Sequence, residues 1–384
     1  MKVLHVITGL AVGGAELQLR SILQHTRHDS EVLALYNPGD VADMITGDGV
    51  RVRDLGMTSN TQVGAVLRMR ALIREGGYDV VHTHLYRACV YGKLAARLAG
   101  TPVVVGTEHS IGETHLERRR MTAGVRGLYL GTDVFAQRTI AVSETVAGRL
   151  AQWGMRADKI SVIPNGVDFG RVSFDSAARA RVRAEHGIDE RAHVIGVLGR
   201  LDANKRFDMV IEAAAPLLGE GAKLLIVGGG AERERLEALA AELGVAEHVV
   251  FAGERHDVSA MLSAFDLFVA SSAQETFGLS VLEALANGMP VLYTTCPALE
   301  GVRTDRARQV PGDVDGMRKE ITAEVTDRRP RGDVPVIRDL YGIEAVTGRI
   351  DDLYERLHSN TRRGANARRG ANRPLAAEQG GGVR

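Results

Sequence analysis

The sequence is poor in cysteine and carries no net charge. Its 384 residues include two cysteines, Cys89 and Cys296, which lie far apart in apolar surroundings. Two isolated cysteines exclude a disulfide framework and a cysteine-rich metal site, and they favour a reducing compartment. The 48 basic and 48 acidic residues cancel. No overall field therefore draws the chain to nucleic acid or to an anionic membrane.

Long apolar runs are also missing. No run reaches the roughly 18 residues that a membrane-spanning helix needs. Lys2 and the apolar stretch up to Val12 resemble a short signal peptide, but the stretch contains His5 and Thr8 and leads into a helical pattern. We interpret it as a buried first strand. We expect a cytoplasmic protein, with peripheral contact at the inner face of the membrane as the most that the sequence allows.

The sequence does contain a regular alternation of strand-like and helix-like segments. Alternating strands and helices indicate parallel, doubly wound sheets. The pattern breaks at Pro164-Asn165-Gly166 and then resumes. Two such units predict an α/β protein with two domains and a deep cleft beyond the ends of their strands. Strands are predicted at 3–8, 31–36, 50–55, 79–84, 102–107, 138–143, 193–200, 223–227, 248–251 and 264–270.

The pattern also suggests where the domains begin and end. We place the first domain at 1–168 and the second at 169–342, although residues 301–340 are hard to assign. A final helix at 343–358 is expected to pack back on the first domain. The basic tail at 359–384 has little to bury and is predicted to be disordered. It is either a solvated tail or a contact for anionic lipid or polymer.

Residues 274–290 are the most informative stretch. They follow an apolar strand and contain a helix with leucines on one stripe, ended by Gly288. Glu275 precedes this helix, where free N–H groups favour negative charge. Glu283 lies on the apolar face, where a carboxylate is costly without a partner. The stretch can hold a sugar, an anion and a ribose in a row. Alternatively, Glu275 caps the helix and Glu283 pairs with an internal arginine.

Two glycine turns follow strands. Gly13-Gly14 and Gly228-Gly229-Gly230 leave the backbone bare enough for an anion or a sugar hydroxyl to approach, although any tight strand-to-helix turn uses such glycines. A dinucleotide fingerprint also requires an acidic residue at the end of the next strand, where this chain has Asn37 and Ala252. A nicotinamide-dependent enzyme is therefore disfavoured.

Cations and histidines follow other strands. Arg200 and Lys205 combine a planar fork with a point charge, which suits a diphosphate; a solvated basic loop is the alternative. His109 ends a strand and is either structural or catalytic. His82 and His84 alternate on a strand, and without a third ligand at metal-like spacing we assign them a structural role. The chain has neither a Gly-x-Ser-x-Gly elbow nor a Walker loop.

Together these motifs resemble the retaining GT-B glycosyltransferases of family four, over roughly residues 1–300 and the final helix. The resemblance implies two Rossmann-like domains facing a cleft, with the acceptor side on the first and the nucleotide-sugar site on the second. It rests on six segments, of which the last three are the most specific: Gly13-Gly14-Ala15-Glu16, Thr107-Glu108-His109, Ala141-Val142-Ser143, Pro164-Asn165-Gly166-Val167-Asp168, Gly199-Arg200 with Lys205, and Glu275 with Glu283.

The resemblance also implies roles for single residues. Arg200 and Lys205 would bind the donor diphosphate, and Glu283 the ribose hydroxyls. His109 would contact the sugar near the reacting carbon. Glu275 would hold the sugar and phosphate together with the N–H groups of Phe277, Gly278 and Leu279. The implied catalytic residues are His109, Glu275, Arg200 and Lys205; the other implied donor-binding residues include Gly13, Gly14 and Asn165.

The activity implied is transfer of a sugar from a nucleoside diphosphate sugar to the hydroxyl of a glycan, lipid-linked or small-molecule acceptor, with retention and without a cofactor. A nucleotide-sugar epimerase or phosphorylase, or a non-catalytic sugar-binding protein, are the alternatives. Residues 293–335 depart from the family pattern and leave the acceptor open. We expect no metal requirement, because Arg200, Lys205 and a helix N-terminus supply the positive field. Asp313-Val314-Asp315 is interpreted as a turn.

Overall fold

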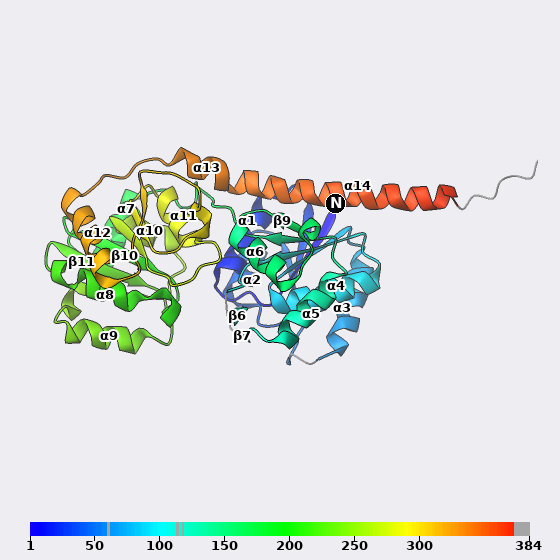
Figure 1. Ribbon diagram of the computed structural model, residues 1–384, viewed down its shortest axis with the longest axis horizontal. Helices are drawn as coiled ribbons and strands as arrows, with labels where there is room; N and C mark the ends of the chain where they lie inside the picture. Colours follow the sequence, from blue (N-terminus) through cyan, green and yellow to red (C-terminus); the bar gives the residue numbers. More distant parts are fainter. Residues whose placement is uncertain (60–61, 113–114, 117–118, 372–384) are drawn as a thin grey trace, which may run out of the picture.

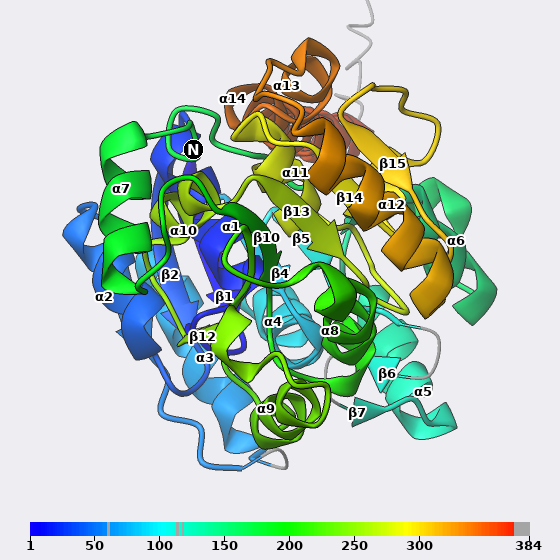
Figure 2. The same cartoon turned by 90° about the vertical axis from the view of Figure 1, so that its left-hand side faces the viewer.

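The computed structural model describes residues 1–59, 62–112, 115–116 and 119–371. It contains two parallel sheets, one in each half of the chain (Figure 1). The first has seven strands in the order β3-β2-β1-β4-β5-β8-β9, and the second has six in the order β12-β11-β10-β13-β14-β15. Figure 2 views the molecule from the side of the second sheet. The predicted fold class, two Rossmann-like α/β domains, is confirmed.

The N-terminal domain is built on apolar strands that are buried on both faces, as a parallel sheet requires. Leu4 and Val6 of β1 pack toward α3 and α4, while Val3 packs on the opposite face. The elements are β1 Lys2–Ile7, α1 Gly14–His25, β2 Asp29–Ala34, α2 Gly39–Gly47, β3 Arg51–Asp54, α3 Gly64–Gly76, β4 Val80–His84, α4 Tyr86–Ala99, β5 Val103–Glu108, β6 His115–Leu116, β7 Arg119–Arg120, α5 Ala123–Asp133, β8 Arg138–Ala141, α6 Glu144–Trp153, η1 Ala157–Lys159 and β9 Ile160–Val162.

The C-terminal domain repeats this plan. Ile195 and Val197 of β10 pack toward α8, α9 and α12, and Val194 packs on the other face. The elements are α7 Ser176–Glu185, β10 His193–Leu198, η2 Ala203–Lys205, α8 Phe207–Ala214, η3 Ala215–Leu217, β11 Ala222–Val227, α9 Arg233–Glu242, η4 Ala246–His248, β12 Val249–Gly253, α10 Val258–Ala264, β13 Leu267–Ala270, α11 Leu279–Ala286, β14 Val291–Tyr293, η5 Pro297–Leu299, β15 Ala307–Gln309, α12 Val314–Asp327, α13 Pro335–Tyr341 and α14 Ile343–Ala371.

The last helix lies along the N-terminal domain (Figure 1). Val346, Ile350 and Tyr354 of α14 pack in one buried cluster with Val3 and Val105 of the sheet. The helix was expected to end at residue 358, and that boundary is wrong, because α14 continues to Ala371 and its end projects past the domain. The prediction of disorder is therefore wrong for 359–371, while residues 372–384 lie outside the described residues.

Two segments connect the domains, one near Val167 and one near Gly342, and these two crossings lie side by side. Val167 forms an isolated parallel bridge with Gly342, and its N–H donates to the carbonyl of Tyr341 over 2.7 Å. A Cβ atom on Gly166 would come within 2.9 Å of the Cα atom of Ile343. The Asn-Gly pair of the sequence break is thus used for a close approach between the two crossings.

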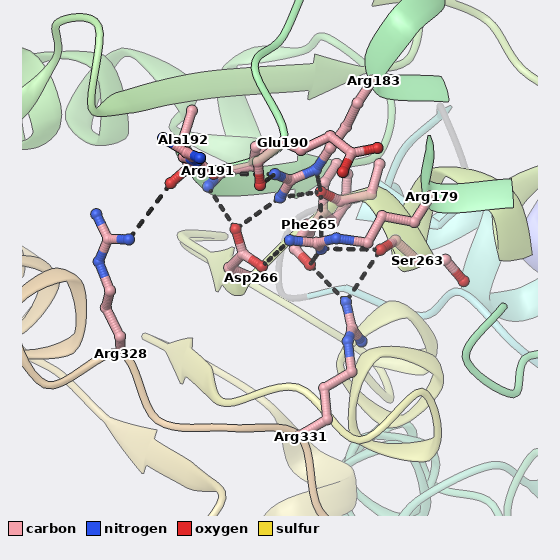
Figure 3. A network of polar contacts seen from close by, with 12 residues as sticks. Arg179, Arg183, Glu190, Arg191, Ala192, Ser263, Phe265, Asp266, Arg328 and Arg331 are labelled. Atoms are coloured by element: carbon pink, nitrogen blue, oxygen red, sulfur yellow. Dashed lines mark hydrogen bonds and ion pairs between the residues drawn. The ribbon is translucent and has the colours of Figure 1, made fainter. Parts of the chain in front are cut away.

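Residues 301–340 contain regular structure that the sequence did not predict, namely β15, α12 and α13. Arg331 fixes the end of this region (Figure 3). Its guanidinium donates to the carbonyl oxygens of Ser263 at 3.2 Å and Asn287 at 3.0 Å. Asp266 lies beside it between Arg179 and Arg183, at 2.7 Å from each. Within the described ranges, no helix is long and apolar enough to cross a membrane.

Candidate active site

A lysine–glutamate pair joins two loops of the C-terminal domain. Lys205 follows β10 and Glu275 follows β13, the strand paired with β10. Lys205 Nζ lies 2.5 Å from Glu275 Oε1, and Ser272 Oγ donates to the same oxygen at 2.8 Å. Glu275 therefore does not cap α11, whose N-cap residue is Gly278. Both charged groups are partly buried, so the pair is held in a defined place.

The two loops are further joined by hydrogen bonds around Asn204. Its side-chain amide donates to the carbonyl of Gln274 at 2.9 Å, and its Oδ1 accepts from the N–H of Gln274 at 3.1 Å. Ser271 Oγ donates to the carbonyl of Lys205 at 2.6 Å. Sequence reasoning missed Asn204 and Ser271. The available signal was that polar residues with short side chains flank Lys205 and follow β13.

The first turn of α11 lies directly after Glu275. Gly278 has φ 98°, a conformation that favours glycine, and a Cβ atom there would meet Cys296 Sγ at 2.4 Å. Phe277 is buried, with its ring 5.7 Å from that of Tyr341 in an edge contact. The N–H groups of a first helical turn have no partner within the helix. In α11 the N–H of Val281 already donates to the carbonyl of Gly278, so those of Leu279 and Ser280 are available to an anion.

Glu283 lies one turn deeper on α11. Its carboxylate makes no hydrogen bond or ion pair within the described ranges, so the proposed pairing with an internal arginine is not found there. Burial raises the pKa of Glu283 to about 7, although the positive charge of Arg171 acts in the opposite direction. A partly buried carboxylate with no protein donor is suited to accept hydroxyl groups of a ligand.

Arg200 is on the loop after β10. Its guanidinium is about half exposed, and its Nε lies 3.7 Å from Asp202. The glycine triplet packs against this loop, because a Cβ atom on Gly230 would lie 2.2 Å from the carbonyl oxygen of Leu201. Gly228 approaches the loop equally closely at Gly199. The triplet therefore has a packing role.

Gly13 and Gly14 begin α1. A Cβ atom on Gly13 would meet Glu16 Oε2 at 2.4 Å, whereas one on Gly14 would meet nothing within 4 Å. The carboxylate of Glu16 therefore occupies the space beside Gly13, whereas the space beside Gly14 is open. Asn165 lies in the crossing beside the α13–α14 junction.

His109 lies directly after β5 and is buried. Its Nε2 is 3.3 Å from Nδ1 of His84, and its Nδ1 has no hydrogen-bond partner within the described residues. Burial lowers the pKa of His109 to about 4, so the ring is neutral near pH 7.

The structure adds detail at two places where the sequence was considered for metal binding and a structural role was preferred. His82 and His84 do have a third histidine nearby, since His5 of the adjacent strand completes a buried group whose ligand atoms lie within 4.8 Å. The spacing rule missed it because β1 and β4 are distant in sequence. Asp313 lies at the start of α12, where its side chain accepts from the N–H of Gly316 at 2.8 Å. The expected turn at Asp313-Val314-Asp315 is therefore a helix cap.

Contacts between the domains come from segments that follow strands. Ser143 Oγ donates to the carbonyl of Thr276 at 2.7 Å, next to Glu275. Thr145 donates to Glu300 at 3.3 Å, and His256 lies 3.6 Å from Asp40. Of the predicted site residues, Lys205 and Glu275 pair directly, and the first turn of α11 follows Glu275 in the chain. The contacts between the domains do not link His109, Gly14 or Asn165 to that group within the described ranges.

Comparison with known families agrees with this arrangement. The model of glycosyltransferase family 4 matches residues 12–171, and the model of glycosyl transferases group 1 matches residues 178–321. The first match covers the N-terminal sheet except for β1, and the second covers the C-terminal sheet.

Individual similar proteins support the same family. A D-inositol 3-phosphate glycosyltransferase from Salinispora arenicola is 30% identical over 343 residues, which cover 82% of this chain and 75% of the relative. One from Salinispora tropica is 33% identical, covering 64% and 55%. Among solved structures, Anabaena HepE with UDP and glucose has a TM-score of 0.82 at 22% identity, covering 92% and 99%. The chain therefore belongs to the family-four, group 1 glycosyltransferases, as its motifs predicted.

Proposed function

We propose that this protein transfers a sugar from a nucleoside diphosphate sugar to an acceptor hydroxyl, with retention of the anomeric configuration. The observation that carries the proposal is the group formed by Lys205, Glu275 and the first turn of α11. It combines a fixed cation, a carboxylate and free N–H groups at the ends of two paired strands. Glu283 lies one turn away and has no hydrogen-bond or ion-pair partner among the described residues, which suits the ribose hydroxyls.

In this proposal the donor diphosphate lies between the N-terminus of α11 and the two cations. Arg200 and Lys205 stabilise the charge that develops as the sugar leaves, which is the kind of stabilisation that lowers a barrier most. The leaving phosphate accepts the proton of the attacking hydroxyl on the same face of the sugar. Glu275 contacts sugar hydroxyls while Lys205 and Ser272 hold its carboxylate in place.

Relatives suggest the first substrates to try. The curated relatives are named for D-inositol 3-phosphate, and the Anabaena protein HepE was solved with UDP-glucose. We propose a uridine diphosphate hexose as donor and a phosphorylated polyol as acceptor. We also propose that the reaction needs no divalent metal, because the two cations and α11 provide positive charge where a metal would otherwise act.

The test is a transfer assay with UDP-glucose and a panel of polyol phosphates, in excess chelator. Mass spectrometry of the product and its anomeric proton coupling report transfer and configuration. Release of UDP together with an α-configured glycoside supports the proposal. Conversion of donor without a glycoside product supports an epimerase or phosphorylase, and tight binding without any turnover supports a sugar-binding protein.

A further inference from the structure

A row of buried polar side chains runs under α14 across the N-terminal sheet. β1, β4 and β5 are adjacent, and His5 lies opposite His82 in register. His82 and His84 are two residues apart and so lie on one face of β4. That face is otherwise apolar, with Val3, Val80, Val103 and Val105 packed against α14. Polar groups in such a place are costly unless they are hydrogen-bonded.

Three of these histidines form a continuous chain that ends at His109, the residue for which the family resemblance implies contact with the donor sugar. His5 Nδ1 lies 3.1 Å from His84 Nε2, and His84 Nδ1 lies 3.3 Å from His109 Nε2. The rings of His84 and His109 are stacked with centroids 5.7 Å apart. We call His5, His84 and His109 the histidine chain. His84 is its middle member and uses both ring nitrogens.

The protonation states of the chain are coupled. Burial lowers the pKa of all three rings, so each is neutral near pH 7. A neutral imidazole has one N–H and one lone pair, so His84 donates to one neighbour and accepts from the other. The nitrogen of His84 that carries the proton therefore decides whether Nδ1 of His109 is protonated.

The surroundings of Nδ1 of His109 indicate which way the hydrogen bonds of the chain point. Nδ1 of His109 is buried and has no partner within the described residues. A buried N–H without an acceptor is rarer and more costly than a buried lone pair without a donor. The lone pair therefore belongs at Nδ1, and the proton at Nε2 is donated to His84.

We propose that His84, supported by His5, is a positioning residue that holds His109 as the Nε2–H tautomer, so that Nδ1 accepts a hydrogen bond from a hydroxyl of the donor sugar. The role of His109 toward the sugar rests on the proposed function. The state of the chain in the free protein does not depend on it.

A metal at His5, His82 and His84 is the competing explanation. The contacts disfavour it, because the nitrogens it would need already have protein partners. His82 contacts the hydroxyl of Tyr354 at 2.5 Å and that of Thr107 at 2.6 Å. His5 and His84 contact one another.

The first experiment uses the wild-type protein with 15N-labelled histidine and no ligand. Two-bond nitrogen–proton correlation spectra at pH 7.5 should show His109 with Nε2 protonated and Nδ1 unprotonated. The His109 signal is identified by its absence from the spectrum of His109→Gln. Protonation at Nδ1 would overturn the proposal. So would zinc in the purified protein at one equivalent, lost on His82→Ala.

The second experiment uses a matched pair of variants. In His84→Asn the amide oxygen occupies the Nδ1 position and still accepts from His109, whereas His84→Gln reaches only the position facing His5. We expect kcat for UDP-glucose within about threefold of wild type for His84→Asn and a loss of about 10- to 100-fold for His84→Gln, by analogy with other orienting contacts. UDP affinity should change less than about twofold in both, which reports intact folding. Equal losses in both variants would overturn the positioning role.

A third variant separates this inference from the proposed function. His109→Ala should reduce kcat by at least the factor seen for His84→Gln. If His109→Ala leaves transfer unchanged while the wild-type spectra show the Nε2–H tautomer, the histidine chain stands and the placement of the donor sugar is wrong. If either His84 variant fails to fold, the wild-type spectra alone decide the state of the chain.

Discussion

At the scale of single residues, the donor site is defined by which charges have partners. Lys205 and Glu275 are paired at 2.5 Å, while Glu283 has no partner within the described ranges. A carboxylate that is partly buried without a donor destabilises the folded chain, and proteins keep such groups where ligands compensate for the cost. This contrast assigns different roles to the two glutamates, in agreement with their different positions in the sequence pattern.

The raised pKa of Glu283 predicts a pH-dependent affinity for the donor. Ribose hydroxyls bind the ionised carboxylate best, so affinity for UDP-glucose should fall as the pH drops below about 7. UDP-glucose suits this test because its bridged diphosphate does not titrate in this range. Calorimetric titrations from pH 5.5 to 8.5 should show the fall for wild type and a flat profile for Glu283→Gln. The exposed Glu242→Gln is the control, and the same fall in Glu283→Gln would exclude the ribose role.

The same residue makes a prediction for stability. Because the folded pKa is above the usual value, the folded state holds the proton longer than the unfolded state. The free energy of unfolding contributed by Glu283 therefore falls as the pH rises from about 4.5 to 7. Glu283→Gln should be more stable than wild type by about 1–3 kcal/mol at pH 8 and equal to it below pH 4.5. Chemical denaturation at both pH values checks this; a destabilised variant at pH 8 would contradict it.

At the scale of elements, the sequence predicted most strands to within a few residues, because apolar runs bounded by turns are strong local signals. It missed α2, which begins directly after Pro38, α5, and the helices between 301 and 340, whose patterns are weak. It also missed the third histidine of the buried group. His5 meets His82 only because β1 and β4 pair in register, and such long-range pairing is invisible in local spacing.

The buried histidines predict a sensitivity to acid. Burial lowers the pKa of His5, His82, His84 and His109, so the unfolded chain binds more protons between pH 4 and 6.5. Stability from these groups is complete above pH 6.5 and is lost as the pH falls, by up to about 1.4 kcal/mol per pH unit for each histidine. Denaturant unfolding at pH 5 and 7 should give a smaller difference for His84→Asn than for wild type. An unchanged difference in His84→Asn would contradict the assignment.

At the scale of the whole molecule, the fold depends on segments that return to earlier parts of the chain. α14 covers the N-terminal sheet. Arg331 attaches the segment before α13 to the C-terminal domain through the contacts drawn in Figure 3. Arg331 donates to carbonyls in the last turn of α10 and to that of Asn287, the C-cap residue of α11. It thereby connects the segment that departs from the family pattern to the helix that carries Glu283.

Removing Arg331 should destabilise the C-terminal domain. Arg331→Met leaves buried carbonyl groups without donors, which we expect to cost about 2–4 kcal/mol of unfolding free energy. Arg328→Met is the matched control, because Arg328 is exposed and donates to the carbonyl of Arg191 over a long 3.3 Å. It should cost less than about 0.5 kcal/mol. Denaturant unfolding compares the two, and equal effects would show that Arg331 is not the anchor.

Above all, we propose a metal-free diphosphate site at Lys205, Arg200 and the first turn of α11. The direct measurement is calorimetric titration of UDP in excess chelator, with Lys205→Met and Arg200→Met, and with the exposed Lys319→Met and Arg303→Met as controls. We predict that wild type and both controls bind UDP in chelator. Each site variant should bind about 10- to 100-fold more weakly, as expected for a lost charge-assisted hydrogen bond. Binding that requires added magnesium or manganese, or unchanged affinity in both site variants, would contradict the account.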